Sequence, residues 1–447
     1  MRFSFPKDFL FGAACSACQI EAGCNEGGKG EDVCEHYYNL YPEKYFGGDP
    51  NKAADFYHRY PQDIQMMQQL GLDAFRFSIS WSRIFPDGPD SLCQAGLDYY
   101  SRMIDCLRAA NIEPFFDLWH CDLPYWVIER GGVLNPAFVD WFRSYAAAVF
   151  DALGQKVHYW ATINEPSINI MSSYAYGSNA PFHTDMDEAI KACHNGILAH
   201  YAAVQEYKKR NLPGKISAVI HMEPVYAWSP DEKDIEAAAR KQAFYTGWWL
   251  DPILKGHYPD ILKPYPYIMD KLPQGYEQQL AENFLPADFI AINYYSPGYA
   301  RYRDDGALFY ETMDNKALPH DDYGFCFYPE GLYDLSMYLK QTYPGKDIFI
   351  VENGYGKKKW ENLTEEREDD YRIDLIRQHL RALSRACQAG APVKGYFHWT
   401  IMDTNELYAG GYHYIFGLTQ VNFETLERIP RKSWYYYQNV IKNRSVE

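Results

Sequence analysis

The sequence contains no apolar run long enough to cross a membrane. Its 447 residues include no stretch of roughly eighteen or more apolar residues, the length that a spanning helix requires. The opening residues, Met-Arg-Phe-Ser-Phe-Pro-Lys-Asp, also lack the apolar core of a secretory signal. We therefore expect no membrane insertion and a cytoplasmic location.

Basic residues are in the minority. The chain has 43 Lys and Arg against 59 Asp and Glu, a net charge of −16. Partners that carry many phosphates, such as nucleic acids or anionic membranes, require a basic surface. We predict neither partner, and we expect the acidic run Glu365 to Asp370 to be the solvated first turn of a helix.

The cysteines form no recognisable framework. Ten are scattered along the chain, which favours reduced thiols in a cytoplasmic protein. The four nearest the N-terminus, Cys15, Cys18, Cys24 and Cys34, do not form the two close pairs typical of a zinc site. We predict no metal and no cofactor.

A glycine-rich phosphate-binding turn is also missing. The first predicted strand continues as Phe11-Gly12-Ala13-Ala14, and Gly27-Gly28-Lys29-Gly30 lacks the spacing and the Ser or Thr of a nucleotide-binding loop. The sequence therefore argues against a doubly wound nucleotide-binding sheet.

Strand-like and helix-like segments alternate along the whole chain. Eight short, nearly continuous apolar runs are typical of parallel strands covered on both faces. They are Phe9–Ala14, Ala74–Ser80, Ile112–Trp119, Val157–Ile163, Lys215–His221, Asp288–Asn293, Asp347–Val351 and Val393–Trp399. Helical periodicity fills the intervals at Pro61–Leu70, Ala95–Ala110, Pro136–Leu153, Met186–Lys209, Asp234–Leu250, Gln274–Asn283, Glu330–Gln341, Thr364–Gln388 and Arg431–Lys442. We predict an α/β fold, a single (β/α)8 TIM barrel in which residues 1–447 form one catalytic domain.

Two glutamates end predicted strands. Glu165 follows the fourth strand and Glu352 the seventh, and in such a barrel these ends meet at one mouth, where active sites form. Cleavage of a glycosidic bond needs one protonated and one ionised carboxyl group. Arg76 in the second strand is a candidate partner that keeps Glu352 ionised. Each glutamate taken alone could instead be half of a buried ion pair.

Longer motifs surround these residues. Thr162-Ile163-Asn164-Glu165-Pro166 and Ile350-Val351-Glu352-Asn353-Gly354 closely resemble the two signatures of family 1 glycoside hydrolases. Gln19-Ile20-Glu21, Phe75-Arg76-Phe77-Ser78 and Asn293-Tyr294-Tyr295 also match that family. The resemblance covers nearly the whole chain and implies a retaining β-glycosidase, most simply an exo-acting β-glucosidase with a small-molecule substrate.

The resemblance also implies roles. Glu165 would be the acid/base and Glu352 the nucleophile, with Arg76 and Tyr295 orienting Glu352 and Asn293 supporting the acid/base. The expected sugar contacts are Asn164 at the 2-hydroxyl, Gln19, His120 and Glu406 at the other hydroxyls, and Trp399 beneath the ring. Phe325 lies where the family usually places a tryptophan that contacts the aglycone. Without the motifs, His120 and Trp399 would be read as ordinary core residues.

Two positions depart from the family pattern. Cys121 follows His120 and Leu407 follows Glu406, where the family usually has tryptophans that reach the sugar's 3-hydroxyl side. Neither side chain replaces an indole N–H donor well. We expect a glycone pocket that is either enlarged there or refilled by Tyr408, Tyr412 or Tyr414.

Two other functions stay open at this point. A 6-phospho-β-glycosidase typically lacks the Glu406 carboxylate, which Asn405-Glu406-Leu407 retains. A non-catalytic carbohydrate-binding barrel generally loses a catalytic glutamate, whereas both are present. A thioglucosidase is disfavoured because that branch replaces the acid/base. The oligomeric state is not predicted.

Overall fold

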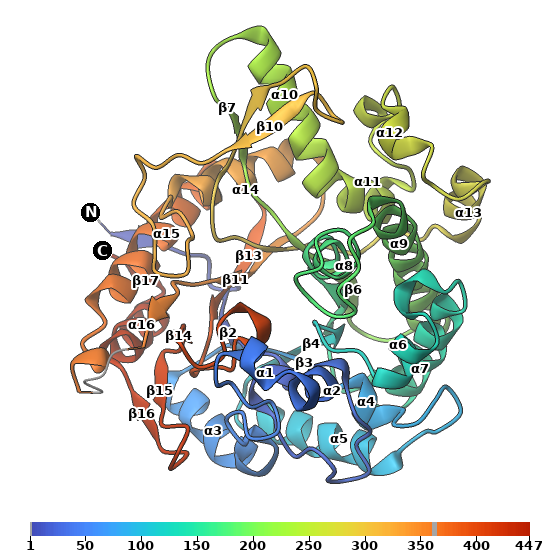
Figure 1. Ribbon diagram of the computed structural model, residues 1–447. Coiled ribbons are helices and arrows are strands. Elements are labelled where there is room, and N and C mark those ends of the chain that lie inside the picture. The colour runs from blue at the N-terminus through green and yellow to red at the C-terminus, as the bar shows by residue number, and fades with distance from the viewer. Residues whose placement is uncertain (1, 360–363) are drawn as a thin grey trace.

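The computed structural model describes residues 2–359 and 364–447, without the side chain of Tyr408. A closed barrel of eight parallel strands forms its centre, surrounded by helices (Figure 1). The strands succeed one another around the barrel in chain order, and the last pairs with the first. They are β2 (Leu10–Ala14), β3 (Ala74–Ser78), β4 (Glu113–Trp119), β5 (Tyr159–Asn164), β6 (Lys215–His221), β8 (Ile290–Asn293), β11 (Ile348–Asn353) and β13 (Val393–Trp399). This confirms the predicted (β/α)8 barrel.

Helices lie around the outside of the barrel (Figure 1). They are α3 (Phe56–Leu70), α5 (Gln94–Ala109), α7 (Phe138–Leu153), α9 (Met186–Lys209), α10 (Glu232–Gln242), α11 (Trp248–Lys255), α13 (Tyr276–Asn283), α14 (Glu330–Thr342), α15 (Asp370–Gln388) and α16 (Lys432–Asn443). Within the described residues, no helix is both long and apolar enough to span a membrane.

Shorter elements build the loops. The short helices are α1 (Ala17–Ile20), α2 (Val33–Leu40), α4 (Trp81–Ile84), α6 (Tyr125–Glu129), α8 (Pro166–Tyr174) and α12 (Pro266–Met269), with helical turns η1 (Pro42–Tyr45), η2 (Gly132–Leu134), η3 (Ala243–Gly247), η4 (Asp260–Leu262), η5 (Glu365–Arg367) and η6 (Leu407–Ala409). The small sheets pair β1 (Phe3–Ser4) with β17 (Ser445–Val446), β12 (Lys357–Lys358) with β14 (Tyr414–Ile415), and β15 (Thr419–Val421) with β16 (Arg428–Pro430). A further sheet joins β7 (Val225–Ala227), β9 (Gly298–Tyr302) and β10 (Tyr310–Met313) beside α10 (Figure 1).

Aromatic rings fill the inside of the barrel. Phe115, Phe289, Phe349 and Phe397 belong to one buried cluster, and the rings of Phe289 and Phe349 lie 5.3 Å apart. Gly12 makes room for this packing, because a Cβ there would lie 2.3 Å from the Phe397 ring. The barrel is therefore a packed core rather than a pore, and polar chemistry is confined to its ends.

Three predicted helices differ from the structure. Helix α3 begins at Phe56 rather than at Pro61, which lies inside it. The segment predicted as Asp234–Leu250 is divided among α10, η3 and α11. The segment predicted from Thr364 is divided between η5 and α15.

The prediction that the acidic run 365–370 is solvated was wrong in part. Glu366 and Asp369 are buried, because each carboxylate has a buried arginine beside it. Glu366 pairs with Arg431 at 2.6 Å, and Asp369 pairs with Arg372 at 2.9 Å. These two acids therefore hold α15 and its neighbours together.

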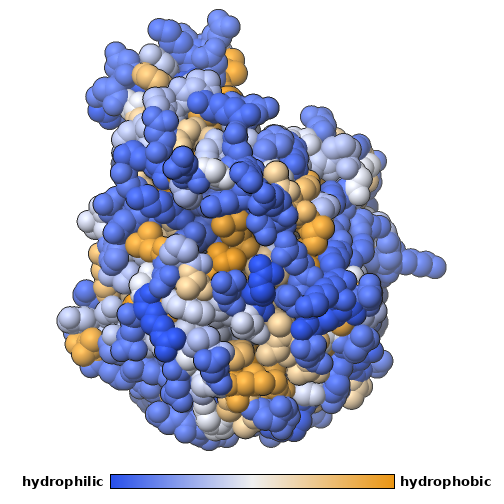
Figure 2. Space-filling model, turned by 90° about the vertical axis from the view of Figure 1, so that its right-hand side faces the viewer, coloured by the Kyte–Doolittle hydropathy of each residue, from blue (hydrophilic) through white to orange (hydrophobic). Residues whose placement is uncertain are grey.

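One face of the molecule is predominantly hydrophilic. Figure 2 shows the side of the molecule that lies at the right in Figure 1, where apolar groups occur only as small separate patches among polar ones. Extended apolar patches mark protein or membrane contacts. This face shows no such patch.

Candidate active site

One pocket opens at the carboxyl ends of the barrel strands. Eleven of the residues singled out from the sequence line it: Gln19, His120, Cys121, Asn164, Glu165, Tyr295, Phe325, Glu352, Trp399, Glu406 and Leu407. The other two, Arg76 and Asn293, are fully buried. Arg76 donates to Glu352, and Asn293 donates to Glu165. The structure therefore brings all thirteen residues together.

Glu352 is held by two donors. Arg76 donates from Nη1 to its Oε1 at 2.5 Å, and the Tyr295 hydroxyl donates to Oε2 at 2.7 Å. Burial raises the pKa of the Glu352 carboxyl, and the Arg76 charge opposes that rise. Both hydrogen bonds stabilise the ionised form of the carboxyl group.

Arg76 is itself fixed by a carboxylate that sequence reasoning did not single out. Asp117 accepts hydrogen bonds from Nε and Nη2 of Arg76, and Nη2 also donates to the Asn164 side chain at 2.7 Å. Asp117 lies inside the apolar strand β4 and is fully buried. An acid within an apolar strand was the signal that could have identified it.

Glu165 stands on a strained backbone at the end of β5. Its φ of 41° and ψ of 52° lie in the left-handed region, where residues other than glycine are uncommon. Asn293 donates to its Oε1 at 2.8 Å, and His221 contacts the same oxygen at 3.2 Å. Strain of this kind clusters at functional sites.

His221 is a second residue that the sequence analysis passed over, although it ends β6 at the same mouth. Its other ring nitrogen lies 3.7 Å from Glu223, which is also 3.7 Å from Lys241. Burial would lower the pKa of His221, but the two glutamates raise it to about 10. The resulting cation, with Asn293, outweighs the effect of burial on Glu165 and lowers the pKa of that carboxyl.

An indole and an imidazole form parallel walls of the pocket. The rings of Trp399 and His120 are stacked 5.6 Å apart at an angle of 4°. Asn164 lies 3.3 Å from His120 Nε2. Trp119, which was not predicted as a site residue, also lines the pocket, and its indole N–H has no partner among the described residues. Its position next to His120 at a strand end was the available signal.

Gln19 and Glu406 complete the polar lining. Ser16 donates to the Gln19 side chain at 2.5 Å, and Thr404 donates to Glu406. Burial raises the pKa of Glu406 to about 7, with the Glu352 charge adding to the rise. Phe325 stacks on Tyr295 at 4.6 Å, at the edge of the same pocket.

Cys121 and Leu407, the two positions that depart from the family pattern, both lie in the pocket wall. Cys121 and Leu407 belong to one small apolar cluster with Val33, Cys34 and Ala180. Tyr412 instead stacks on Phe423, and Tyr414 packs against Tyr323. Neither of these two tyrosines lines the pocket, and the side chain of Tyr408 lies outside the described residues.

Comparison with known proteins identifies the family. A family model described as glycosyl hydrolase family 1 matches residues 1–446. The chain belongs to glycosyl hydrolase family 1. It is 37% identical to beta-glucosidase A of Acetivibrio thermocellus over 99% of each chain. A family 1 member described as 6-phospho-beta-glucosidase GmuD, from Bacillus subtilis, is 33% identical over 99% of this chain and 98% of that one.

Solved structures of family 1 enzymes agree with this assignment. The family 1 β-glucosidase from Thermotoga maritima superimposes with a TM-score of 0.94 at 33% identity and full coverage of both chains. The same enzyme is also known in complex with isofagomine lactam, at the same TM-score. This family 1 chain is therefore a glycoside hydrolase in which both signature glutamates are present.

Proposed function

We propose that this family 1 enzyme is a retaining, exo-acting β-glucosidase and that residues 1–447 act as one catalytic domain. The observation that carries the proposal is the pair of carboxyl groups, Glu165 and Glu352, lining one pocket with different partners. The relatives named as β-glucosidases support glucose as the sugar. The ten free cysteines support a reducing, cytoplasmic compartment.

The family 1 motifs support both roles, and the two donors to Glu352 support its role as the nucleophile. Glu352, held by Arg76 and Tyr295, attacks the anomeric carbon as a carboxylate, while Glu165 donates its proton to the leaving oxygen and the glycosidic bond breaks. Glu165 then removes a proton from water, which attacks the anomeric carbon and releases Glu352. Two inversions give net retention, for which the two carboxyl groups should lie about 5–5.5 Å apart. That separation stays a prediction.

Two substitutions test these roles. Glu352→Gly should abolish hydrolysis, because no nucleophile remains, and azide should partly restore turnover of an activated substrate. Glu165→Ala should slow alkyl glucosides far more than aryl glucosides with good leaving groups, because only the former need the proton. Steady-state kinetics on both substrate types measure these losses, and circular dichroism checks that each variant is folded. Equal losses on both substrates, or an α-anomer as first product by NMR, would contradict the assignment.

A 6-phospho-β-glucosidase activity is less well supported. Glu406 retains a carboxylate in the pocket, and above its pKa of about 7 it would repel a phosphate dianion. The rates of hydrolysis of nitrophenyl β-glucoside and of its 6-phosphate distinguish a β-glucosidase from a 6-phospho-β-glucosidase. Preference for the phosphate would overturn the proposal.

The pocket wall at Cys121 and Leu407 suggests a second property, tolerance of a substituted sugar. Tyr412 and Tyr414 do not line the pocket, so neither takes the place of the missing indoles there. A lost indole donor costs on the order of 1 kcal/mol of binding for a plain glucoside, whereas the lost bulk admits a substituent at the 3-position. We expect Cys121→Trp and Leu407→Trp, singly and together, to raise activity on plain glucosides relative to 3-substituted ones. An unchanged ratio of activity on plain and 3-substituted glucosides would show that these two positions have no influence on specificity.

A further inference from the structure

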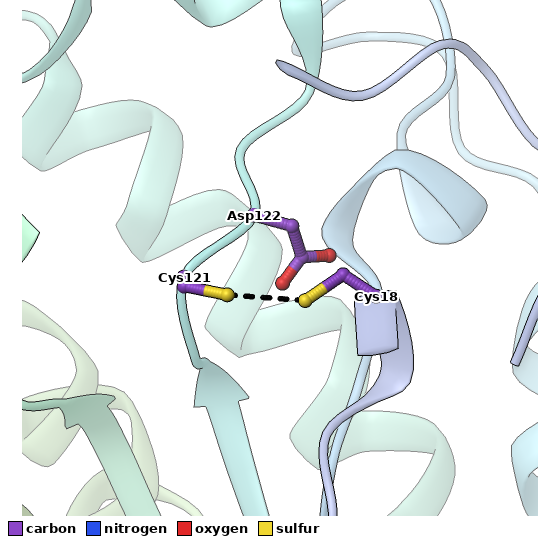
Figure 3. A group of neighbouring side chains, drawn as sticks. All are labelled: Cys18, Cys121 and Asp122. Carbon is purple, nitrogen blue, oxygen red and sulfur yellow. Dashed lines mark hydrogen bonds between the residues drawn. The ribbon is translucent and has the colours of Figure 1, made fainter. Parts of the chain in front are cut away.

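Two thiols from distant parts of the chain meet behind the pocket. Cys18 lies in α1, and Cys121 directly follows His120 after β4. Their sulfur atoms are 3.1 Å apart (Figure 3). Cys18 immediately precedes Gln19, so each thiol adjoins a residue proposed to bind sugar hydroxyls.

A buried carboxylate faces these thiols. Asp122 is only 2% exposed, and its Oδ1 has no hydrogen-bond partner among the described residues. Ligand atoms of Cys18, Cys121 and Asp122 all lie within 4.8 Å of one another, and Figure 3 shows the carboxyl group turned toward the two sulfurs. Burying an unpaired carboxylate is costly unless a cation accompanies it.

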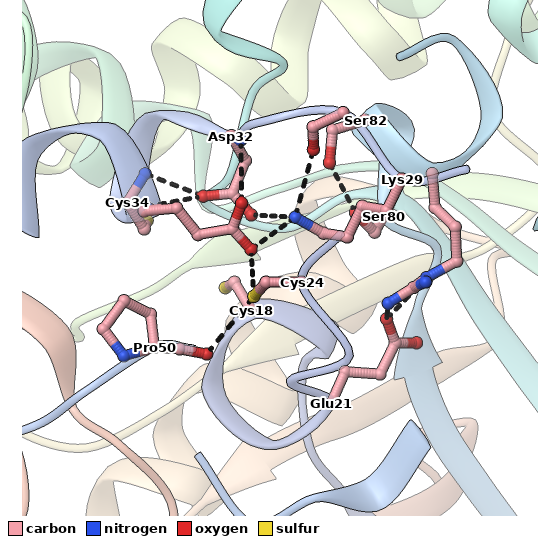
Figure 4. Close-up of polar contacts among 12 residues, drawn as sticks. Cys18, Glu21, Cys24, Lys29, Asp32, Cys34, Pro50, Ser80 and Ser82 are labelled. Carbon is pink, nitrogen blue, oxygen red and sulfur yellow. Dashed lines mark hydrogen bonds and ion pairs between the residues drawn. The ribbon is translucent and has the colours of Figure 1, made fainter. Parts of the chain in front are cut away.

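Neighbouring acids share a cation supplied by the protein itself. Lys29 lies 3.0 Å from Asp32 (Figure 4). It also pairs with Glu35. Asp122 has no ion pair of this kind within the described part of the chain. Asp122 therefore differs from Asp32 and Glu35 in having no cation beside it among the described residues.

We propose that Cys18, Cys121 and Asp122 form a binding site for a thiophilic divalent cation of the zinc class, in the wall of the sugar pocket. Two sulfur ligands and one oxygen ligand suit Zn²⁺, which binds sulfur at about 2.3 Å and oxygen at about 2.0–2.2 Å. Binding would displace the two thiol protons into solvent, and the two thiolates with the Asp122 carboxylate would offset the charge of the ion. Small rotations of the two cysteine side chains open their sulfurs to the spacing that coordination requires.

A third thiol lies nearby. Cys34 belongs to the same apolar cluster as Cys18 and Cys121, and Cys34 and Cys121 line the pocket. The fourth coordination position is therefore open to water from the pocket.

One other cluster could compete for a metal ion. Asp314, His320 and Cys326 also place ligand atoms within 4.8 Å of one another. That cluster has a single thiol, Asp314 is exposed, and the His320 ring already contacts Cys326 at 3.0 Å and Asp314 at 3.4 Å. It provides a matched control for the proposed site.

Cobalt titration of the reduced, chelator-treated enzyme tests the proposal. We expect one equivalent of Co²⁺ to produce thiolate-to-cobalt charge-transfer absorption that Zn²⁺ abolishes by displacement. Cys18→Ser and Cys121→Ser should lose the band, and Asp122→Asn should weaken the affinity at least tenfold. Cys326→Ser should leave the band intact. Zn²⁺ should also protect Cys18 and Cys121 from alkylation by iodoacetamide, as read by peptide mass spectrometry.

The outcomes that overturn the site are distinct. Absence of the band in the wild-type enzyme, or its loss in Cys326→Ser instead of Cys18→Ser, would exclude it. A Cys18–Cys121 disulfide formed on mild oxidation, together with no cobalt binding by the reduced protein, would show a redox pair in its place. Because binding is measured spectroscopically, the result does not depend on the sugar specificity.

Discussion

At the scale of single residues, His221 opposes the effect of burial on the proposed acid/base. Its cation lies 3.2 Å from Glu165 and lowers the pKa of that carboxyl. In His221→Asn the positive charge is lost, so ionisation of Glu165 becomes less favourable and its pKa rises. We expect the basic limb of the kcat/KM profile for an alkyl glucoside to move upward by about one pH unit.

A histidine at the opposite end of the barrel provides the control. His158 contacts Glu113 at 3.0 Å, where β4 and β5 begin. His158→Asn should leave the pH profile unchanged. An unchanged basic limb in His221→Asn would mean that the histidine does not control the protonation of Glu165.

The sequence predicted residues that end strands better than residues that support them. Glu165, Glu352 and their motif neighbours are recognisable because each follows a long apolar run. Asp117 escaped because it lies within a predicted strand. His221 ends a predicted strand, but its contact with Glu165 depends on which strands the closed barrel places side by side. The contact between Cys18 and Cys121 likewise joins loops 103 residues apart, so no local spacing indicates it.

At the scale of elements, Arg431 connects the loop that carries Glu406 to the outer helices. The guanidinium is fully buried, donates to both Asp403 oxygens at 2.8 Å, and pairs with Glu366 at 2.6 Å. Arg431→Met would remove the cation that the buried carboxylates of Asp403 and Glu366 share. We expect a loss of about 3–5 kcal/mol in the free energy of unfolding, measured by urea denaturation.

An exposed ion pair gives the matched comparison. Arg385 pairs with Glu330, and both side chains are 44% exposed. Arg385→Met should change the free energy of unfolding by less than about 1 kcal/mol. If both substitutions cost the same, burial of the Arg431 network does not account for its contribution.

The strands of the barrel were more predictable than the elements of its rim. The eight barrel strands are buried on both faces and appear as apolar runs, whereas β7, β9 and β10 are three to five residues long and partly exposed. Such short segments have neither a continuous apolar run nor a clear alternation. The β7–β9–β10 sheet depends on pairing between loops, which the sequence does not encode locally.

At the scale of the whole molecule, the two ends of the described chain are joined on one side of the barrel. Strands β1 and β17 pair through Phe3 and Val446, and Arg444 contacts Asp73 just before β3 begins (Figure 1). Both ends therefore lie where the barrel strands start, while the pocket opens where they finish. A solid support attached near either end would face away from the pocket mouth, so the enzyme can be immobilised there with its substrate entrance uncovered.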